Sequence, residues 1–226
     1  MARHTGLLLF WSVCLVWLPN SAASGERVAA EKLEFHRNER IAVVGNSLAE
    51  RMNLYGHFET RLQLCFADSE LKFRNFGFPA DAVELQQRPN NYTRIDDPLK
   101  VFSPETFLCF FGYNESFAGE DGIDQFKANY LYYIERLQRD FKTPSGSAVR
   151  IILVSPVAFE STGQGFQPDG TRENGNLARY TQAIREIAEV RDLKFVDVFD
   201  ETLQIFGQQP GAQYTINGCH LNEAGD

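Results

Sequence analysis

Arg40-Ile41-Ala42-Val43-Val44-Gly45-Asn46-Ser47-Leu48 is the stretch that decides the fold of this 226-residue chain. After the leading arginine, the five residues Ile41 to Gly45 form an uninterrupted apolar run, which predicts a strand buried on both faces. From 48 to 66, apolar residues recur at three- and four-residue steps, so we expect a helix there. A buried strand that leads directly into a helix indicates the first unit of an α/β fold.

The rest of the chain repeats this alternation. Four more segments have the composition of strands, at 71–76, 106–111, 150–157 and 193–199. Helical patterns lie between them at 125–141 and within 173–190, where we place the helix start near Asn176. Strands that alternate with helices predict parallel crossovers, so we expect one α/β domain built as a three-layer α/β/α sandwich.

Two segments fit no regular element, 79–104 and 156–176, and both are rich in turn residues. The second follows the carboxyl end of a strand, the edge of an open parallel sheet where ligands bind. We therefore expect it to shape a pocket, with a plain surface insertion as the alternative.

The N-terminus has the layout of a secretory signal peptide over residues 1–23. A basic start precedes an apolar stretch that is shorter than the roughly 20 residues of a membrane span, which favours cleavage over an uncleaved anchor. We expect a signal peptide at 1–23, a lead-in at 24–39 and the main domain at 40–226, in a secreted or periplasmic protein. Residues 221–226 begin like a helix, so we expect the chain to continue beyond Asp226 in a larger protein.

Charge and cysteine content exclude several classes of function. Signal cleavage moves the net charge from −8 to about −9, and such an acidic surface argues against nucleic acid as a partner. Cys65, Cys109 and Cys219 would remain, and their odd number and wide spacing exclude a disulfide framework and a zinc site. Free buried thiols are favoured over a single bridge, and we expect no metal and no cofactor.

Ser47 is the leading candidate for a nucleophile. It stands between the first strand and the first helix, where the free N–H groups of a helix N-terminus favour a developing oxyanion. Taken alone, it is more simply explained as an N-cap. A lone histidine is likewise more often structural than catalytic, but His220, on a turn after the last strand, is better placed than His36 or His57 to reach Ser47.

Two further strand ends carry groups that suit an oxyanion site. Gly77 follows the second strand, and a glycine lets the backbone come close enough for its N–H to point into a site. Asn114 follows the third strand, and its amide can donate to an oxyanion, although Asn is also favoured in turns. Four strand ends thus deliver Ser, Gly, Asn and His in that order.

This combination resembles the SGNH hydrolases, also called GDSL-like lipases and esterases, which are named for those four residues. The similar blocks are Gly45-Asn46-Ser47-Leu48 to GDSL, Gly77 to the second block, Gly112-Tyr113-Asn114-Glu115 to G-x-N-D and Asn217-Gly218-Cys219-His220 to D-x-x-H. The resemblance runs from about Arg40 to Gly225. It implies a flavodoxin-like parallel sheet of five strands in the order 2-1-3-4-5.

The resemblance also implies a carboxylic ester hydrolase with assigned roles. Ser47 attacks the ester carbonyl, and His220 takes its proton and later gives it to the leaving alcohol. The N–H groups of Ser47 and Gly77 and the amide of Asn114 hold the oxyanion. We expect a secreted serine esterase that acts on a small ester or an acylated carbohydrate, the latter by family analogy.

Two positions depart from the family pattern. Asn46 replaces the usual aspartate before the serine, which is the milder change. Asn217 stands where the triad aspartate belongs, and in serine proteases an Asp→Asn change costs about 10⁴-fold. The carbonyl oxygen of Asn217, or a backbone carbonyl, could still orient His220. We therefore expect a dyad-like or weaker triad.

Two other functions remain open from the sequence. The first is a non-catalytic SGNH-like domain that binds an extracellular glycan or other ligand; Asn217 favours it, whereas the retained Ser47, Asn114 and His220 oppose it. The second is a flavodoxin-like cofactor binder, which predicts a yellow protein carrying flavin.

Cysteine catalysis is not expected, because Cys219 and His220 are neighbours on a turn and neighbours there rarely face each other productively. Asn114-Glu115-Ser116 is a formal glycosylation sequon, as is Asn91-Tyr92-Thr93. Glycosylation would remove the proposed oxyanion donor, so we expect Asn114 to be unmodified.

Overall fold

The computed structural model describes residues 33–86, 88, 96–208 and 213–226. The chain divides into two compact units, Met1–Glu34 and Phe35–Asp226, and every element below belongs to the second. The signal peptide predicted at 1–23 and most of the lead-in at 24–39 lie outside the described residues. Within the described ranges, no helix has the length and apolar character needed to span a bilayer.

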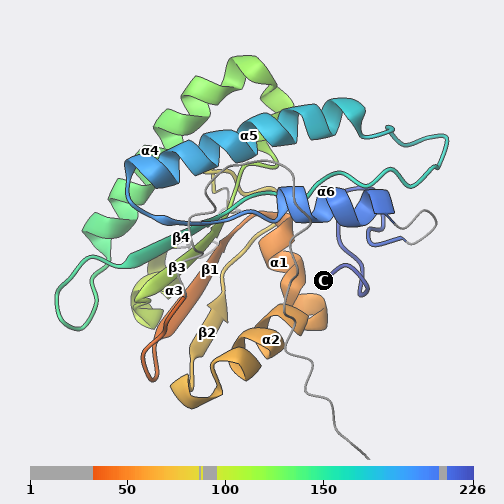
Figure 1. The fold of residues 1–226 in the computed structure, drawn as a ribbon. Coiled ribbons are helices and arrows are strands. Elements are labelled where there is room, and N and C mark those ends of the chain that lie inside the picture. Colours follow the sequence, from red (N-terminus) through yellow and green to blue (C-terminus); the bar gives the residue numbers. More distant parts are fainter. Residues whose placement is uncertain (1–32, 87, 89–95, 209–212) are drawn as a thin grey trace, which may run out of the picture. The chain divides into compact units, whose positions relative to one another are not determined.

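Five parallel strands form one sheet in the order β2-β1-β3-β4-β5 (Figure 1). They are β1 (Arg40–Gly45), β2 (Lys72–Asn75), β3 (Thr106–Phe110), β4 (Arg150–Val154) and β5 (Lys194–Val196). Gly45 pairs with Phe110, and Phe110 pairs with Val154, so the carboxyl ends of the three central strands are level. The predicted fold class and the implied strand order are confirmed.

Helices cover both faces of this sheet (Figure 1). On one face α4 (Ile123–Asp140) and α5 (Thr171–Val190) pack against each other, and α3 (Asp96–Phe102) joins the same core. On the other face lie α1 (Ser47–Tyr55) and α2 (His57–Cys65), with Phe58 of α2 against Phe110. The last helix, α6 (Phe199–Gln208), contacts α5. The described part of the chain also contains short 3-10 helices at Ala67–Ser69, Glu115–Ala118 and Glu120–Gly122.

The core explains why the strands are apolar without interruption. Side chains alternate between the two faces of a strand, and here both faces are covered, so consecutive residues are buried. On the α4 and α5 side the buried strand residues are Ala42, Val44, Phe107, Cys109, Ile151 and Leu153.

The predicted helix at 48–66 is in fact two helices. Gly56 separates α1 from α2 with a φ of 72°, and its N–H bonds to the carbonyl of Met52. A left-handed residue ends a helix, and glycine adopts that conformation without steric cost. The apolar periodicity continues across the break, which is why it predicted a single helix.

The helices also differ from the sequence prediction elsewhere, and β4 and β5 are shorter than the strands predicted at 150–157 and 193–199. The helix placed near Asn176 begins at Thr171. The segment 79–104, expected to be irregular, contains α3, where Pro98 is tolerated because the N–H groups of a first helical turn need no partner within the helix. The segment after β5 forms α6, which had not been predicted.

Candidate active site

A pocket of about 210 Å³ opens at the carboxyl edge of the sheet, beside the ends of β1, β3 and β4. Ser47, Asn114 and His220 all line it, so the structure brings together three of the residues singled out from the sequence. Much of the remaining wall is apolar, formed by Phe110, Phe111, Phe117, Pro156 and Val157. The pocket is therefore suited to a small ligand with an apolar part.

Ser47 is the first residue of α1, and Asn46 caps the helix in its place. The side-chain oxygen of the buried Asn46 accepts a hydrogen bond from the N–H of Leu48 at 3.0 Å. The capping role considered for Ser47 is therefore wrong. Asparagine in place of aspartate keeps the acceptor oxygen that a cap requires, and the Ser47 hydroxyl is not used in capping.

The turn that presents Ser47 depends on Gly45. Its φ is +145°, and a Cβ atom at this position would lie 2.3 Å from the carbonyl oxygen of Phe110. Only glycine allows β1 and β3 to approach so closely here. The same approach lets the N–H of Asn46 bond to that carbonyl at 3.2 Å, which fixes the start of α1 against β3.

Asn217 holds the imidazole of His220 in one orientation. Its Oδ1 accepts hydrogen bonds from the backbone N–H of His220 at 3.0 Å and of Cys219 at 3.4 Å. Because backbone N–H groups only donate, this atom is the oxygen of the amide. Nδ1 of His220 lies 3.0 Å from the same oxygen and therefore carries the proton. Nε2 is left with the lone pair that a general base needs.

Burial lowers the pKa of His220, and the positive charge of Arg51 lowers it further. The imidazole is therefore neutral at neutral pH. Arg51 also donates to the carbonyl of Leu221, at 3.0 Å from one terminal nitrogen, and so ties α1 to the histidine loop. Sequence reasoning missed Arg51, although it stands four residues after Ser47 and therefore on the same face of the helix.

A buried glutamate anchors the loop that carries His220. Glu160 is 4% exposed, and its carboxylate accepts from the N–H groups of Tyr214 and Thr215 and from the Thr215 hydroxyl, at 2.6–2.9 Å. The hydroxyl of Thr215 in turn accepts from the N–H of Gly218 at 2.9 Å. The N–H of Glu160 donates to the carbonyl of Gly218 at 2.8 Å. Glu160 is an acidic residue directly after the largely apolar segment 150–159, and this position in the sequence could have indicated its anchoring role.

Cys219 contacts the histidine, contrary to the sequence expectation. Its Sγ lies 3.2 Å from Nδ1 of His220 and 3.4 Å from Oδ1 of Asn217. Burial raises the pKa of this thiol, which keeps it protonated and a poor nucleophile. The expectation of free thiols is confirmed for Cys65, Cys109 and Cys219, but Cys65 is exposed and Cys219 is only half-buried.

Asn114 is held by the loop that follows β2. Its amide nitrogen donates to the carbonyl of Asp81 at 2.9 Å, which leaves one amide hydrogen for the pocket. The adjacent Glu115 accepts from the N–H groups of Val83 and Gly112, both at 2.9 Å, and burial raises its pKa. These bonds tie the loops after β2 and β3 together. Ser116 of the sequon is buried, which supports the expectation that Asn114 is unmodified.

The structure does not bring Gly77 to the pocket. Its N–H donates to Oδ1 of Asn75 at 2.8 Å, and a Cβ atom there would lie 2.6 Å from the N–H nitrogen of Glu50. Gly77 therefore serves the close packing of this loop on α1. Ala80 lines the pocket in its place, with a φ of +65° that is uncommon for a residue other than glycine. Nothing in the sequence signals a left-handed alanine.

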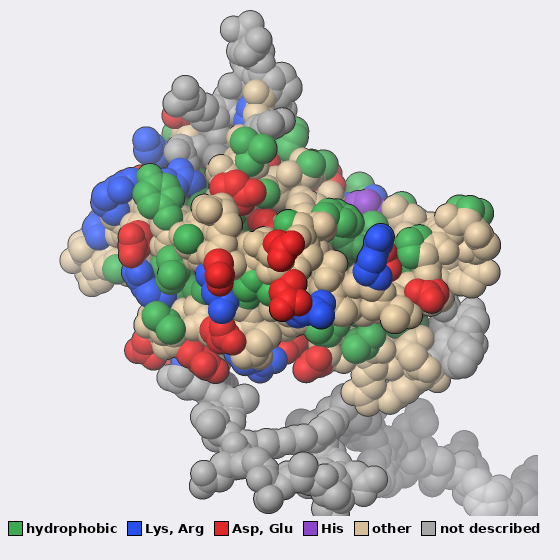
Figure 2. Space-filling view, turned by 90° about the horizontal axis from the view of Figure 1, so that it is seen from above, with side chains coloured by type: hydrophobic (Ala, Val, Ile, Leu, Met, Phe, Trp, Pro, Cys, Tyr) green, Lys and Arg blue, Asp and Glu red, His purple; other side chains and the backbone are tan. Residues whose placement is uncertain are grey.

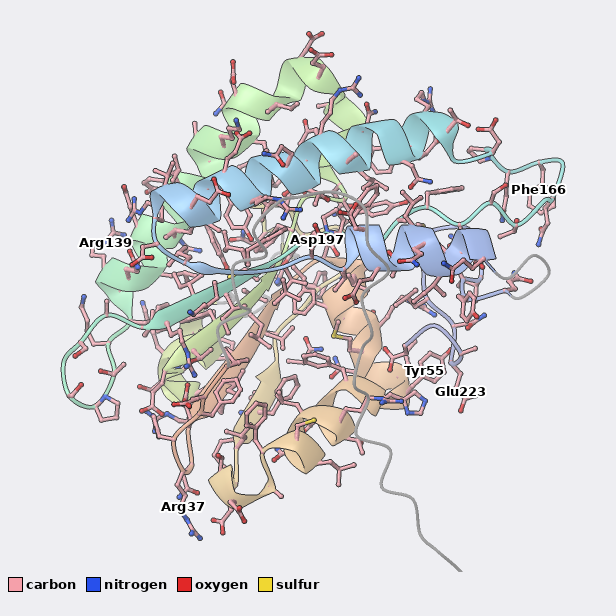
Figure 3. All side chains as sticks on the ribbon, viewed as in Figure 1. Arg37, Tyr55, Arg139, Phe166, Asp197 and Glu223 are labelled. Atoms are coloured by element: carbon pink, nitrogen blue, oxygen red, sulfur yellow. The ribbon has the colours of Figure 1, made fainter. Side chains whose placement is uncertain are left out.

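The long loop between β4 and α5 contributes to the pocket only at its beginning. Pro156 and Val157 line the pocket, as expected for this edge of the sheet. Farther along, Phe166 is exposed on the part of the loop that extends past the start of α5 (Figure 3).

The surface seen from above mixes acidic, basic and hydrophobic side chains (Figure 2). Among the residues that the structure describes, no group of three or more His, Cys, Asp or Glu is placed to hold a metal ion.

Comparison with known proteins gives a family and several structural neighbours. The sequence model of the GDSL-like lipase/acylhydrolase family matches residues 43–226. Among solved structures, a catalytic mutant of an acetylxylan esterase from Geobacillus stearothermophilus is similar, with a TM-score of 0.63 and 14% identity over 85% of this chain and 91% of that chain. An α/β hydrolase enzyme from the metagenome of Lake Arreo, Spain, has a TM-score of 0.62 and 15% identity over 84% and 91%.

A third structural neighbour is a gut microbial diltiazem-metabolizing enzyme, with a TM-score of 0.60 and 16% identity over 84% of this chain and 44% of that chain. At these identities the structural likeness shows the fold. Among curated proteins, none matches the sequence.

Proposed function

This chain belongs to the GDSL-like lipase/acylhydrolase family and is a carboxylic ester hydrolase, and we propose that it is a secreted serine esterase that removes short acyl groups from carbohydrate. The observation that carries the proposal is the shared pocket of Ser47, Asn114 and His220 at the carboxyl edge of the sheet. The signal-peptide pattern at 1–23 supports secretion.

The proposed reaction begins at Ser47. Its Oγ attacks the ester carbonyl while Nε2 of His220 accepts the hydroxyl proton. The imidazolium keeps its Nδ1–H on Oδ1 of Asn217, an orientation that the structure already provides. His220 then gives the proton to the leaving alcohol, and an acyl-Ser47 ester remains. Water, deprotonated by His220, hydrolyses this ester and restores the serine.

Three donors would stabilise the oxyanion. The N–H of Ser47 belongs to the first turn of α1, whose N–H groups have no partner within the helix. The amide of Asn114 supplies a second donor. For the third we propose the N–H of Ala80 rather than that of Gly77, because Ala80 lines the pocket and no acceptor for its N–H occurs among the described residues. Donors of this kind act mainly on the transition state, where the charge develops.

Asn217 stabilises the imidazolium of His220 less than an aspartate would. The catalytic mutants of the structurally similar acetylxylan esterase replace a serine, an aspartate and a histidine, with the aspartate three residues before the histidine. Asn217 and His220 have the same spacing. The amide oxygen of Asn217 orients the imidazole but carries no full charge to stabilise the imidazolium.

The pocket and these neighbours support the proposed substrate class. Phe110, Phe111, Pro156 and Val157 leave a small apolar space beside Ser47, which fits a short acyl chain. Acetylated carbohydrate is the substrate class named for the acetylxylan esterase. A glycan-binding domain without activity is the second candidate, and Asn217 is the observation that favours it.

The test is hydrolysis of p-nitrophenyl acetate and p-nitrophenyl butyrate by wild type, Ser47→Ala and the matched control Ser145→Ala, which alters an exposed turn. We expect activity in wild type and in the control, and none above background in Ser47→Ala. Equal activity in all three proteins would mean that Ser47 is not the nucleophile. A folded wild type that is inert but binds glycan would support the second candidate.

A further inference from the structure

A second cavity, of about 170 Å³, adjoins the candidate active site. Tyr113 and Phe117 line both cavities and so form the wall between them. The far side of the second cavity is the first part of α5, with Arg172, Glu173 and Asn176. Together the two cavities reach the lower end of the range of about 300–1,000 Å³ that is typical of small-ligand sites.

The two cavities differ in chemistry. The first is largely apolar around Ser47, whereas the second presents a carboxylate, an amide and a guanidinium. Glu173 is mostly enclosed, with 13% of its side chain exposed. Its Oε1 accepts from Arg172 at 3.0 Å, and Oε2 has no hydrogen-bond partner among the residues that the structure describes. One acceptor of a mostly enclosed carboxylate is therefore available to a ligand.

The charges of this cavity are balanced. Arg172 pairs with Glu173, and its own side chain is 85% exposed, so the pair presents both a donor and an acceptor without a large net charge. Asn176 adds an amide, and Leu177 forms a buried apolar base. Such a site favours a neutral ligand with several hydroxyl groups over an anion or a cation. The two charges of the site already pair with each other, and a neutral ligand leaves both of them paired.

Phe117 provides the apolar face that such a ligand needs. The ring is 74% exposed and packs edge-on against Tyr113, with the ring centroids 5.9 Å apart. An aromatic face is electron-rich and attracts the polarised C–H bonds on one side of a sugar ring. Tyr113 stays protonated, since burial, and to a smaller extent the nearby carboxylate of Glu173, raises its pKa, so its hydroxyl also remains a neutral group.

We propose that this second cavity binds the alcohol part of the substrate, a polyhydroxylated sugar ring, while the acyl group occupies the apolar pocket beside Ser47. Glu173 and Asn176 hydrogen-bond the ring hydroxyls, and Phe117 covers its C–H face. The inference rests on the proposed esterase function and names Glu173 as the residue that sets alcohol specificity. The scissile ester then lies at the boundary formed by Tyr113 and Phe117.

The test compares two acetyl esters with different alcohols, a methyl xyloside carrying one acetyl group and p-nitrophenyl acetate, which has no hydroxyl group. For Glu173→Gln we expect the ratio of kcat/KM for the xyloside over kcat/KM for p-nitrophenyl acetate to fall about 10- to 100-fold, the loss expected for a hydrogen bond to a charged group. The loss should appear mainly as a higher KM for the xyloside. Phe117→Ala should lower the same ratio.

The matched control is Glu189→Gln, an identical substitution at an exposed position near the end of α5, which should leave the ratio unchanged. A wild type that hydrolyses p-nitrophenyl acetate while Glu173→Gln leaves the ratio unaltered would overturn the alcohol site and leave the esterase proposal intact. A wild type that hydrolyses neither ester would contradict the esterase proposal itself, and the alcohol site with it.

Binding of methyl xyloside to the Ser47→Ala protein, followed by NMR, gives a readout that does not depend on catalysis. We expect perturbed signals in Ser47→Ala and weaker binding in the double variant with Glu173→Gln. Equal binding by both proteins would also overturn the proposal.

Discussion

The two ends of the sheet both bury polar side chains, but they use them differently. At the amino-terminal edge, Glu39 and Glu105 are 4% and 5% exposed. Glu39 accepts from the Thr106 hydroxyl at 2.5 Å, from the N–H of His36 at 3.0 Å and from Arg150. Both carboxylate oxygens of Glu39 thus have partners, and Oε2 of Glu105 accepts from the N–H of Arg40 at 3.1 Å, which is the usual condition for buried charge in a stable fold.

The polar side chains at the carboxyl edge also form a network of hydrogen bonds, but this network is incomplete at the pocket. Asn46, Glu115 and Glu160 complete their hydrogen bonds within the protein. Ser47 and Asn114 instead line a pocket, and among the described residues no hydrogen bond uses the Ser47 hydroxyl. In Figure 3, Arg37 marks the amino-terminal end of the sheet and Asp197, after β5, lies toward the carboxyl edge.

This difference between the two edges indicates where reactive groups lie in this fold. Polar groups whose bonds are completed by the protein stabilise it, whereas groups held in place with one bond unused are available to a substrate. Asn46 and Glu160 at the carboxyl edge are as enclosed as Glu39 and Glu105 at the other edge, so burial alone does not separate structure from function. Substitutions at the two edges should therefore have different consequences.

His220→Ala should have the largest effect. It removes the base that accepts the Ser47 proton, and we expect kcat for p-nitrophenyl acetate to fall by about 10⁴-fold or more. The free energy of unfolding should change little, because the anchors of this loop are Glu160 and Thr215. Steady-state kinetics and urea unfolding of the same protein check both statements. A loss below about tenfold would remove His220 from the mechanism.

Asn114→Ala should have the next largest effect. It removes one oxyanion donor, and we expect kcat to fall about 10²- to 10³-fold with little change in KM. Asn129→Ala on α4, outside the pocket, serves as the control. If KM rises instead while kcat is kept, Asn114 binds the ground state of the substrate and is not an oxyanion donor.

Glu39→Gln tests the other edge. The change weakens the bonds to Arg150 and Thr106, and we expect a loss of about 1–3 kcal/mol in the free energy of unfolding with kcat unchanged. Urea unfolding beside the exposed control Glu59→Gln measures the loss. A large drop in kcat in the folded variant would show that the two edges are not independent.

Asn217→Asp should have the smallest effect, a gain of a few-fold in kcat at pH 8, as expected for about 1 kcal/mol from a charged acceptor on the imidazolium.

The pH dependence of kcat/KM shows in which direction the same substitution moves the pKa of His220. His220 must be neutral to act as base, and burial together with Arg51 lowers its pKa, so wild-type activity should persist below pH 6.5. The added carboxylate favours the imidazolium, so the acid limb of kcat/KM should move to higher pH. A shift to lower pH would contradict the contact between Asn217 and Nδ1.

Much of the fold could be predicted from the sequence because the patterns that indicate its strands and helices are periodic or local. The continuous apolar run from Ile41 to Gly45 reflects burial on two faces, and the positions of the residues at strand ends follow directly from the parallel arrangement. Ser47 and Asn114 were found in this way, whereas His220 lies beyond α6 and was found from the short block Asn217–His220. The break at Gly56 was missed because apolar periodicity continues through it.

The residues that were missed act through distant contacts. Ala80 lines the pocket because of a left-handed backbone conformation that its side chain does not signal. Glu160 accepts a hydrogen bond from Thr215, which lies 55 residues later in the chain. The Cys219 thiol contacts Nδ1 of His220 because the hydrogen bonds of Asn217 close the turn that carries both residues. Such pairings depend on how loops cross in space, which no periodicity encodes.

The central claim, that Ser47 is a nucleophile activated by His220, is tested most directly by labelling with an alkyl fluorophosphonate. We expect intact-mass measurement to show one adduct per chain, peptide mapping to place it on Ser47, and labelling to be lost in Ser47→Ala and strongly slowed in His220→Ala. An adduct on another residue, or no adduct on a protein that hydrolyses esters, would contradict the account.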